Sequence, residues 1–181
     1  MILGIRTAGG TEPLTVGDGF YESVGAPRVG DILDEETVAL IYLEHQRREA
    51  MKIALRLLAF ADNSERSLTE KLRRKGIPRE IAEETVREVV RLGYLDEMRA
   101  LAVLVRAAAN GKLHGPLRVR AELAAKGYPQ AKISRAISAL CESGEVDFEE
   151  NFRLLLEKKT DGHPSPEEIQ KYKVKYGYKS C

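Results

Sequence analysis

The chain of 181 residues has few of the residue types that build covalent or metal-centred sites. Its two cysteines, Cys141 and Cys181, are too few for a disulfide framework. Its three histidines, at positions 45, 114 and 163, are isolated from one another and no Cys-x-x-Cys occurs, so we expect no metal site. Cys141 falls within an apolar helical pattern, which predicts a small buried hydrophobic residue rather than a functional thiol.

Long apolar runs are also missing, since the longest falls far short of the roughly 20 residues that a membrane span needs. The first ten residues lack the basic start and extended apolar core of a secretory signal, so we expect a cytoplasmic protein with no membrane partner. The glycines at 9–10 and 17–19 supply neither a P-loop nor a dinucleotide-binding fingerprint. We therefore expect no cofactor, no small-molecule substrate and no enzymatic activity.

What the chain does contain is an internal repeat. Residues 64–96 and 115–147 carry the same pattern fifty-one positions apart: Leu68, Leu72, Lys75, Gly76, Ile77 and Pro78 match Val119, Leu123, Lys126, Gly127, Tyr128 and Pro129. Further on, Gly93, Leu95 and Asp96 match Gly144, Val146 and Asp147. A period near fifty indicates a stacked array of small units, none of which buries its apolar face alone.

Each repeat is predicted to be a unit of three helices. The first is short and amphipathic, and it ends at a glycine that can adopt a left-handed conformation, Gly76 or Gly127. The second has apolar residues at helical spacing, Ile81, Val86, Val89 and Val90 or Ile133, Ile137, Leu140 and Cys141. Asp96 and Asp147 are predicted N-caps of the third helix, and Glu150 lies where a capping box would place it.

The two ends of the chain differ from the repeats. Residues 1–33 contain seven glycines between short apolar runs, which predicts two or three strands with a hairpin around residues 17–19. Asp34 is the predicted N-cap of a long helix that ends near Ala61. Near the C-terminus, Ser165 and Glu168 resemble a capping box, and Gly177 matches Gly76. This segment is either a truncated third copy or a polar tail.

The predicted fold is therefore mainly α, with tandem three-helix repeats in an elongated array, a small β-rich N-terminal segment and a long linking helix. The expected segments are 1–33 with short strands, 34–61 as the linking helix, 62–110 and 111–160 as the two repeats, and 161–181 as the truncated repeat or tail.

Positive charge is concentrated in the repeats. Residues 1–63 hold 6 Lys and Arg against 10 Asp and Glu, whereas residues 64–181 hold 23 against 18. The excess lies on the first helices and their approaches, which makes these residues the candidate binding site for a protein partner or nucleic acid: Arg66, Lys71, Arg73, Arg74, Lys75, Lys112, Arg118, Arg120 and Lys126. The alternative is that each belongs to an ordinary solvated helix face.

Several motifs together resemble the RecX family of RecA regulators. They are ALRLLA at 54–59, RRKGI at 73–77, GYLD at 93–96, GPLRVRAELAAKGY at 115–128 and VGDILDEET at 29–37. The match covers about residues 29–157, and more weakly 165–178. Glu97 supplies the second acidic residue that the family has after GYLD, but Ala100 and Leu101 replace its usual aromatic and alanine pair.

The resemblance implies a non-enzymatic modulator that lies along the RecA filament on DNA. Such a protein inhibits RecA ATPase, strand exchange and coprotease activity, which links it to DNA repair, homologous recombination and the SOS response. The expected partners are the RecA filament and single-stranded DNA, and the protein itself is expected to be a monomer.

Two other functions fit parts of the pattern. Three-helix units with tight turns also occur in helix-turn-helix regulators that bind duplex DNA. Against this reading, the predicted second helix at 78–92 carries four glutamates, which suits a DNA-recognition helix poorly. A scaffold whose cations only keep it soluble is the third possibility.

Overall fold

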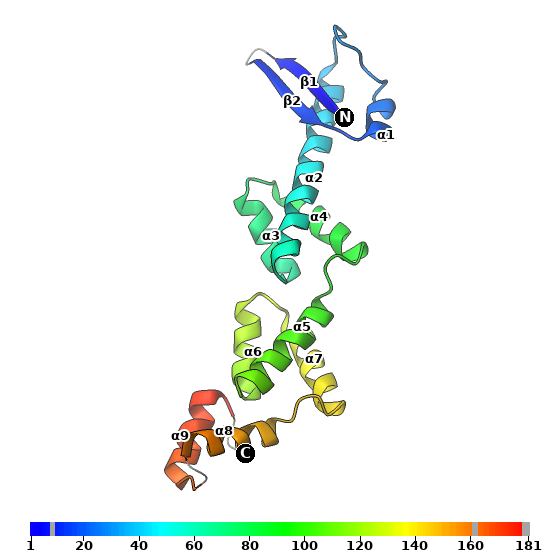
Figure 1. Ribbon diagram of the computed structural model, residues 1–181. Coiled ribbons are helices and arrows are strands. Elements are labelled where there is room, and N and C mark those ends of the chain that lie inside the picture. Colours follow the sequence, from blue (N-terminus) through cyan, green and yellow to red (C-terminus); the bar gives the residue numbers. More distant parts are fainter. Residues whose placement is uncertain (8–9, 161–162, 179–181) are drawn as a thin grey trace. The chain divides into compact units, whose positions relative to one another are not determined.

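The computed structural model describes residues 1–7, 10–160 and 163–178, which form a small sheet followed by helices (Figure 1). The elements are β1 (Ile2–Thr7), β2 (Gly10–Thr15), α1 (Asp18–Ser23), α2 (Glu35–Phe60), α3 (Glu65–Arg74), α4 (Arg79–Arg91), α5 (Glu97–Arg106), the π-helix η1 (Ala107–Gly111), α6 (Pro116–Ala125), α7 (Gln130–Glu142), α8 (Phe148–Thr160) and α9 (Pro166–Tyr176). The predicted mainly α fold with an N-terminal sheet is confirmed.

Two compact units divide the chain. The first comprises Met1–Ala61 and Leu68–Tyr94, and the second comprises Asp62–Ser67 and Leu95–Cys181. The boundary crosses α3, so the first residues of this helix belong to the second unit. The five-segment division expected from the sequence stays a prediction.

The N-terminal sheet pairs β1 and β2 antiparallel, with Ile2 opposite Thr15. The hairpin predicted around residues 17–19 is wrong. Gly17 has an extended backbone, with φ −79° and ψ 154°, and its carbonyl accepts the first helical hydrogen bond from Tyr21. These glycines therefore start α1, while the strands are joined through positions 8–9, which lie outside the described residues.

Helix α2 begins where the sequence predicts it. The Asp34 side chain accepts a hydrogen bond from the Thr37 amide at 2.7 Å, which lowers the pKa of this carboxyl group. Ile41 of α2 packs with Leu14 and Val16 of the hairpin segment and is fully buried. One face of the small sheet is thereby covered by α2.

The first helices of the repeats end as predicted. Leu68 and Leu72 of α3 are fully buried, and Gly76 ends the helix with a left-handed φ of +87°. Gly127 repeats this conformation with φ +88°. The Ile77 amide donates to the Leu72 carbonyl at 3.2 Å, and the Tyr128 amide donates to Leu123 at the same distance. The glycine stop is thus the same structure twice.

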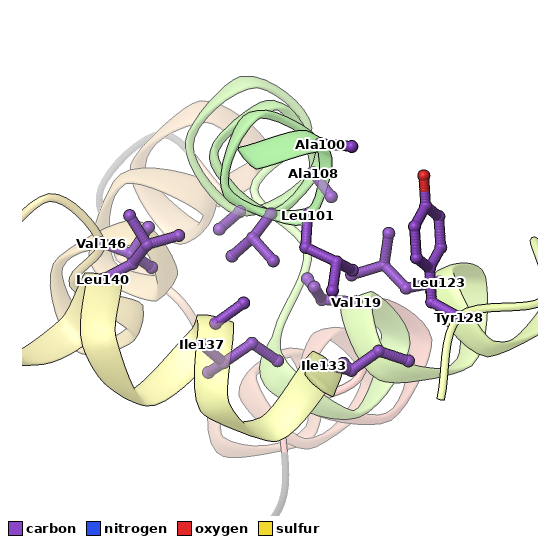
Figure 2. Packing of buried hydrophobic residues seen from close by; sticks show 13 residues of the cluster. Ala100, Leu101, Ala108, Val119, Leu123, Tyr128, Ile133, Ile137, Leu140 and Val146 are labelled. Atoms are coloured by element: carbon purple, nitrogen blue, oxygen red, sulfur yellow. The ribbon is translucent and has the colours of Figure 1, made fainter. Parts of the chain in front are cut away.

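The core of the second unit joins α5, α6 and α7 (Figure 2). Leu101 and Val105 of α5 are fully buried, as are Val119 of α6 and Ile133 of α7. Each helix contributes an apolar stripe at helical spacing. Helix α5, the predicted third helix of the first repeat, packs here with the first and second helices of the second repeat.

The predicted burial of Cys141 is wrong, because this residue is exposed. The buried stripe of α7 runs through Ile133, Ala136, Ile137 and Leu140, and Cys141 lies one position beyond it. Its counterpart Val90 is 37% exposed, so both repeats turn this position away from the core.

The N-caps of the third helices are only partly as predicted. Asp96 accepts a hydrogen bond from the Arg99 amide, and Asp147 accepts bonds from the Glu149 and Glu150 amides. The Glu150 carboxylate pairs with Arg153 instead of bonding back to Asp147, so the predicted capping box is missing its second half.

Helix α9, near the C-terminus, has the features of the first helix of a repeat. Ser165 accepts from the Glu168 amide, and the Glu168 carboxylate accepts from the Ser165 amide, so the predicted capping box is confirmed. Gly177 ends α9 with φ +79°, and Tyr178 is buried with Leu113 and Leu155. The reading as a polar tail is wrong for residues 165–178.

Candidate partner-binding surface

Helix α3 carries most of the candidate cations of the first repeat. Because Leu68 and Leu72 form its buried stripe, Arg73 and Arg74 lie on the exposed side. Lys71, Arg73 and Arg74 occupy the last turn, where the helix dipole favours positive charge. The α3 sequence thus both forms a helix and presents cations at its C-terminal end.

The turn after α3 forms an open hollow in the first unit. It is lined by Glu70, Arg73, Arg74, Gly76, Ile77 and Arg79. Arg74 Nη2 lies 4.0 Å from Glu70 Oε2, and Arg79 Nε donates to Glu83 Oε1 at 2.7 Å. The hydrogen bond from Arg79 lowers the pKa of Glu83 below its ordinary value. Arg79 also lines this hollow, but it is not among the nine cations predicted from the sequence. Its position next to Pro78, in the turn after α3, could have indicated that it lies near them.

The cations at the start of α6 are mostly engaged by Glu122. Lys112 Nζ lies 3.3 Å and Arg118 Nε 3.4 Å from this carboxylate, and Arg118 Nη1 also donates to the Lys175 carbonyl at 2.9 Å. Burial raises the pKa of Glu122, but the hydrogen bond from Lys112, the charge of His114 when it is protonated and the charge of Lys112 outweigh it, so the net shift is downward. Lys112 and Arg118 are therefore partly neutralised within the unit.

His114 lies in the same cluster. Its side chain is 10% exposed and Nδ1 is 2.8 Å from Glu122 Oε1, although the direction is not that of a hydrogen bond. Burial lowers the pKa of His114 despite the opposing effect of Glu122. Burial thus favours the neutral form of the imidazole.

Four of the nine candidate cations have no side-chain hydrogen bond or ion pair among the described residues, and all four are exposed. These four free cations are Arg73, Lys75, Arg120 and Lys126. Arg73 and Lys75 lie at the end of α3 in the first unit. Arg120 lies on α6 and Lys126 at its end in the second unit, and Lys126 occupies the repeat position of Lys75. Arg66 and Lys71 each take part in an interaction within the chain.

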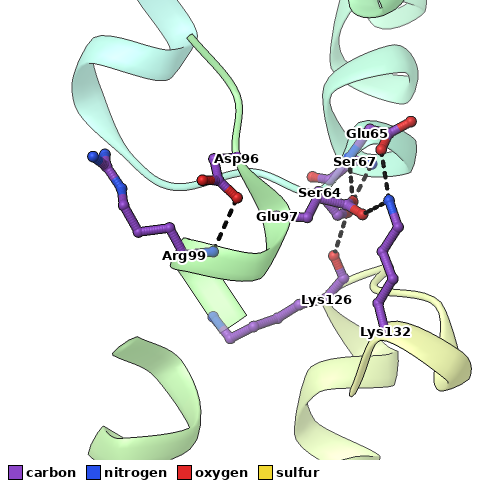
Figure 3. Close-up of polar contacts among 8 residues, drawn as sticks. All are labelled: Ser64, Glu65, Ser67, Asp96, Glu97, Arg99, Lys126 and Lys132. Atoms are coloured by element: carbon purple, nitrogen blue, oxygen red, sulfur yellow. Dashed lines mark hydrogen bonds and ion pairs between the residues drawn. The ribbon is translucent and has the colours of Figure 1, made fainter. Parts of the chain in front are cut away.

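A polar junction fixes the start of α3 against the second repeat (Figure 3). Ser64 Oγ donates to the Lys126 carbonyl at 3.0 Å and accepts from the Ser67 amide at 3.1 Å. Gly127 lies so close that a Cβ there would be 2.8 Å from Ser64 Oγ. The left-handed turn after α6 therefore packs directly on the N-terminus of α3.

An ion-pair cluster completes this junction. The Glu97 side chain is 3% exposed; its carboxylate accepts from the Glu65 amide at 2.7 Å and from Lys132 Nζ at 2.6 Å. Lys132 also donates to Glu65 at 2.8 Å. The hydrogen bond to Glu65 is the largest cause of the raised pKa of Lys132, and the hydrogen bond to Glu97 is the next. The sequence does not predict that Glu97 and Lys132 pair, because the two side chains meet only when α5 and α7 pack together.

The same junction recurs with α9. The Gly115 amide donates to the Tyr176 carbonyl at 2.7 Å, and the Leu117 amide donates to the Gly177 carbonyl at 3.1 Å. A Cβ on Gly115 would lie 2.6 Å from the Tyr178 amide nitrogen, so a side chain has no room there. In both cases within the second unit, the glycine turn that follows a first helix contacts the N-terminus of the first helix one repeat earlier.

The described residues hold no group of three or more His, Cys, Asp or Glu side chains arranged to bind a metal ion. In the described ranges, no helix is long and apolar enough to cross a membrane. The fold and the exposed cations together define a tandem three-helix repeat protein whose candidate binding residues are exposed cations in each unit.

Comparisons with known proteins agree with this class. Residues 50–88 match the family model "RecX, first three-helix domain". Regulatory protein RecX of Stenotrophomonas maltophilia (strain K279a) is 37% identical over 116 residues, which cover 64% of this chain and 68% of that protein. Regulatory protein RecX of Pseudomonas putida is 32% identical over 61% of this chain and 75% of its own length.

Two solved structures share the fold. A crystal structure of regulatory protein RecX has a TM-score of 0.73 at 22% identity and covers 99% of this chain and 94% of its own. RecX from Lactobacillus salivarius has a TM-score of 0.62 at 20% identity, over 75% and 88% of the two chains. From the sequence relatives, the chain belongs to the RecX family of regulatory proteins.

Proposed function

We propose that this protein binds the RecA nucleoprotein filament in the cytoplasm and inhibits RecA ATPase, recombinase and coprotease activity during DNA repair, without catalysing a reaction itself. The observation that carries the proposal is membership of a family of regulatory proteins. The four free cations support it, since within the described part of the chain none of them makes a hydrogen bond or ion pair with an acidic side chain.

The free cations suit both partners that the proposal requires. Exposed Arg and Lys side chains bind acidic protein surfaces, and they bind nucleic acid phosphates with release of counterions. Contact with single-stranded DNA therefore predicts that binding weakens steeply as salt increases. Contact with RecA alone predicts a shallower salt dependence.

The test is the steady-state ATPase of RecA on single-stranded DNA. Wild-type protein is expected to lower ATP hydrolysis in a dose-dependent way. The variant Arg73→Glu with Lys75→Glu reverses two free cations and is expected to weaken inhibition by about tenfold or more, because each reversal replaces an attraction with a repulsion.

A matched control reverses two other exposed cations that make no hydrogen bond or ion pair in the described ranges, Arg56→Glu with Arg135→Glu. This variant has the same net charge and is expected to inhibit like wild type. No inhibition by folded wild-type protein in molar excess contradicts the proposed function. Equal loss in both variants shows that only net charge matters, which leaves Arg73 and Lys75 as ordinary surface.

The alternative, a helix-turn-helix regulator that binds duplex DNA, has an observation against it. The second helix of the first repeat, α4, presents glutamates that pair with arginines: Glu83 with Arg79 at 2.7 Å and Glu88 with Arg91 at 2.6 Å. These pairs leave little positive charge for a DNA groove. Sequence-specific binding to a duplex in the absence of RecA would favour this alternative.

A further inference from the structure

The N-terminal hairpin leaves one strand edge open. The Met1 amino group donates to the Val16 carbonyl at 2.9 Å, and the Val16 amide donates to the Met1 carbonyl at 3.0 Å, so these two residues form a hydrogen-bonded pair. In an antiparallel ladder such pairs alternate with pairs whose backbone groups point outward. Gly4 opposite Pro13 is then an outward pair, which agrees with the lack of an N–H on proline.

The outer edge of β2 is protected around Pro13 and Thr15. Pro13 offers no donor there, and the outward Thr15 amide donates to His45 Nδ1 on α2 at 2.9 Å. Tyr42 of α2 donates to the Glu12 carboxylate at 2.7 Å, which anchors α2 along this strand. Proline and a covering helix are two ordinary ways in which proteins protect a strand edge.

The outer edge of β1 has neither protection. The outward backbone groups belong to Ile2, Gly4 and Arg6, and these make no hydrogen bond within the described part of the chain. All three residues are exposed, Ile2 to 71%. An exposed strand edge on which three alternate residues have unpaired backbone N–H and C=O groups can bind another strand.

We propose that β1 pairs antiparallel with β1 of a second copy of this chain, centred on Gly4, to form a four-stranded sheet across a two-fold axis. This register pairs Ile2 with the partner's Arg6, and Gly4 with the partner's Gly4. Every outward group of Ile2, Gly4 and Arg6 on both copies then has a partner, which gives about six hydrogen bonds. The proposal is independent of the function proposed above.

The strand is complementary to itself in charge and shape. Its one charged side chain, Arg6, lies opposite an apolar residue rather than a second arginine, so no like charges face each other. On the other face, the half-buried Leu3 lies opposite the partner's Ile5, and these side chains already pack on the hairpin core. Glycine at the axis leaves no side chains to collide. A second copy therefore fits this edge without any change in β1.

Because the interface is one strand from each copy, the dimer is expected to be weak and to dissociate on dilution. The monomer expected from the sequence is then the dilute state. Sedimentation equilibrium of the full chain, from low micromolar to near-millimolar concentration, is expected to fit a monomer–dimer equilibrium.

The discriminating variant is Gly4→Pro. The Gly4 amide points away from β2, so proline there removes the central donor of the edge but no bond of the hairpin. Loss of one hydrogen bond from each copy is expected to raise the dimer dissociation constant about tenfold or more. Gly4→Ala keeps the amide, and its Cβ would meet only Thr11 Cγ2 at 3.4 Å, so it is expected to dimerise like wild type.

Amide hydrogen exchange of the wild-type protein tests the register even if Gly4→Pro misfolds. The Ile2, Gly4 and Arg6 amides are expected to gain protection as concentration rises, while those of Leu3 and Ile5 stay protected throughout. Wild-type protein that remains monomeric at the highest concentration overturns the proposal and leaves the edge for a strand of a different protein. Self-association without protection of these three amides also overturns it.

Discussion

Gly76 and Gly127 occupy the same position in the two repeats, and replacing each with alanine separates backbone strain from packing. Both have a left-handed φ, +87° and +88°. Alanine in this conformation costs about 1–2 kcal/mol, reduced by up to about 1 kcal/mol because alanine restricts the unfolded chain. A Cβ on Gly76 meets nothing within 4 Å, so Gly76→Ala is expected to cost only this net strain, about 1 kcal/mol.

Gly127→Ala carries a second cost. Its Cβ would lie 2.8 Å from Ser64 Oγ, which must move. That oxygen bonds both the Lys126 carbonyl and the Ser67 amide, and each lost bond costs about 1 kcal/mol. The free energy of unfolding is therefore expected to fall by about 1–2 kcal/mol more in Gly127→Ala than in Gly76→Ala.

Urea unfolding followed by circular dichroism measures both variants against wild type. Because the chain has two compact units, each resolved transition is fitted by itself. Equal destabilisation by the two alanines would refute the reasoning, since it would mean that the contact between Gly127 and Ser64 contributes nothing.

Three further predictions concern the second unit. Lys132→Met leaves the buried Glu97 carboxylate without its cation and is expected to lower the free energy of unfolding in urea by about 1–2 kcal/mol. This cost is smaller than for a fully buried ion pair because the Lys132 side chain is 41% exposed. An unchanged free energy of unfolding would count against the junction. Tyr128→Phe removes a buried hydroxyl that has no partner among the described residues and is expected to leave the melting temperature unchanged or higher. Tyr178→Phe loses the bond to the Leu113 carbonyl and is expected to cost about 1 kcal/mol, so the opposite order of these two variants would contradict the assignment. Because the pKa of His114 is lowered in the folded protein, the unfolded chain binds the proton more readily, and stability is expected to fall as pH drops below about 6.5. Thermal melts from pH 7.5 to 5.5 should show a smaller decrease in melting temperature for His114→Gln than for wild type.

The candidate site was only partly predictable. The sequence located nine cations on and near the first helices, but it could not tell which of them have partners. Lys112 and Arg118 are partly neutralised by Glu122, whereas Arg120, two residues after Arg118, is free. Whether a surface charge is paired depends on side-chain directions around the helix and on neighbouring elements, which a linear pattern does not record.

The mistaken predictions have a similar origin. The sequence predicts a core position for Cys141 because this residue ends an apolar run, but the buried stripe of α7 ends at Leu140. The glycines at 17–19 suit a turn and a helix start equally well by composition. Small differences in helical phase, or in which carbonyl accepts a hydrogen bond, decided both cases.

The sequence by itself determined the repeat, the glycine stops and the caps at Asp34, Asp96 and Ser165. These features depend on residues within a few positions of one another, so local periodicity and capping chemistry are sufficient to predict them. Only the tertiary structure decided the rest: Lys132 meets Glu65 sixty-seven positions away, the turn at Gly127 contacts Ser64, and α2 covers part of the outer edge of β2 while that of β1 stays uncovered. Such contacts depend on how helices and strands pack, because packing brings together groups whose separation in the chain carries no information about their distance in space.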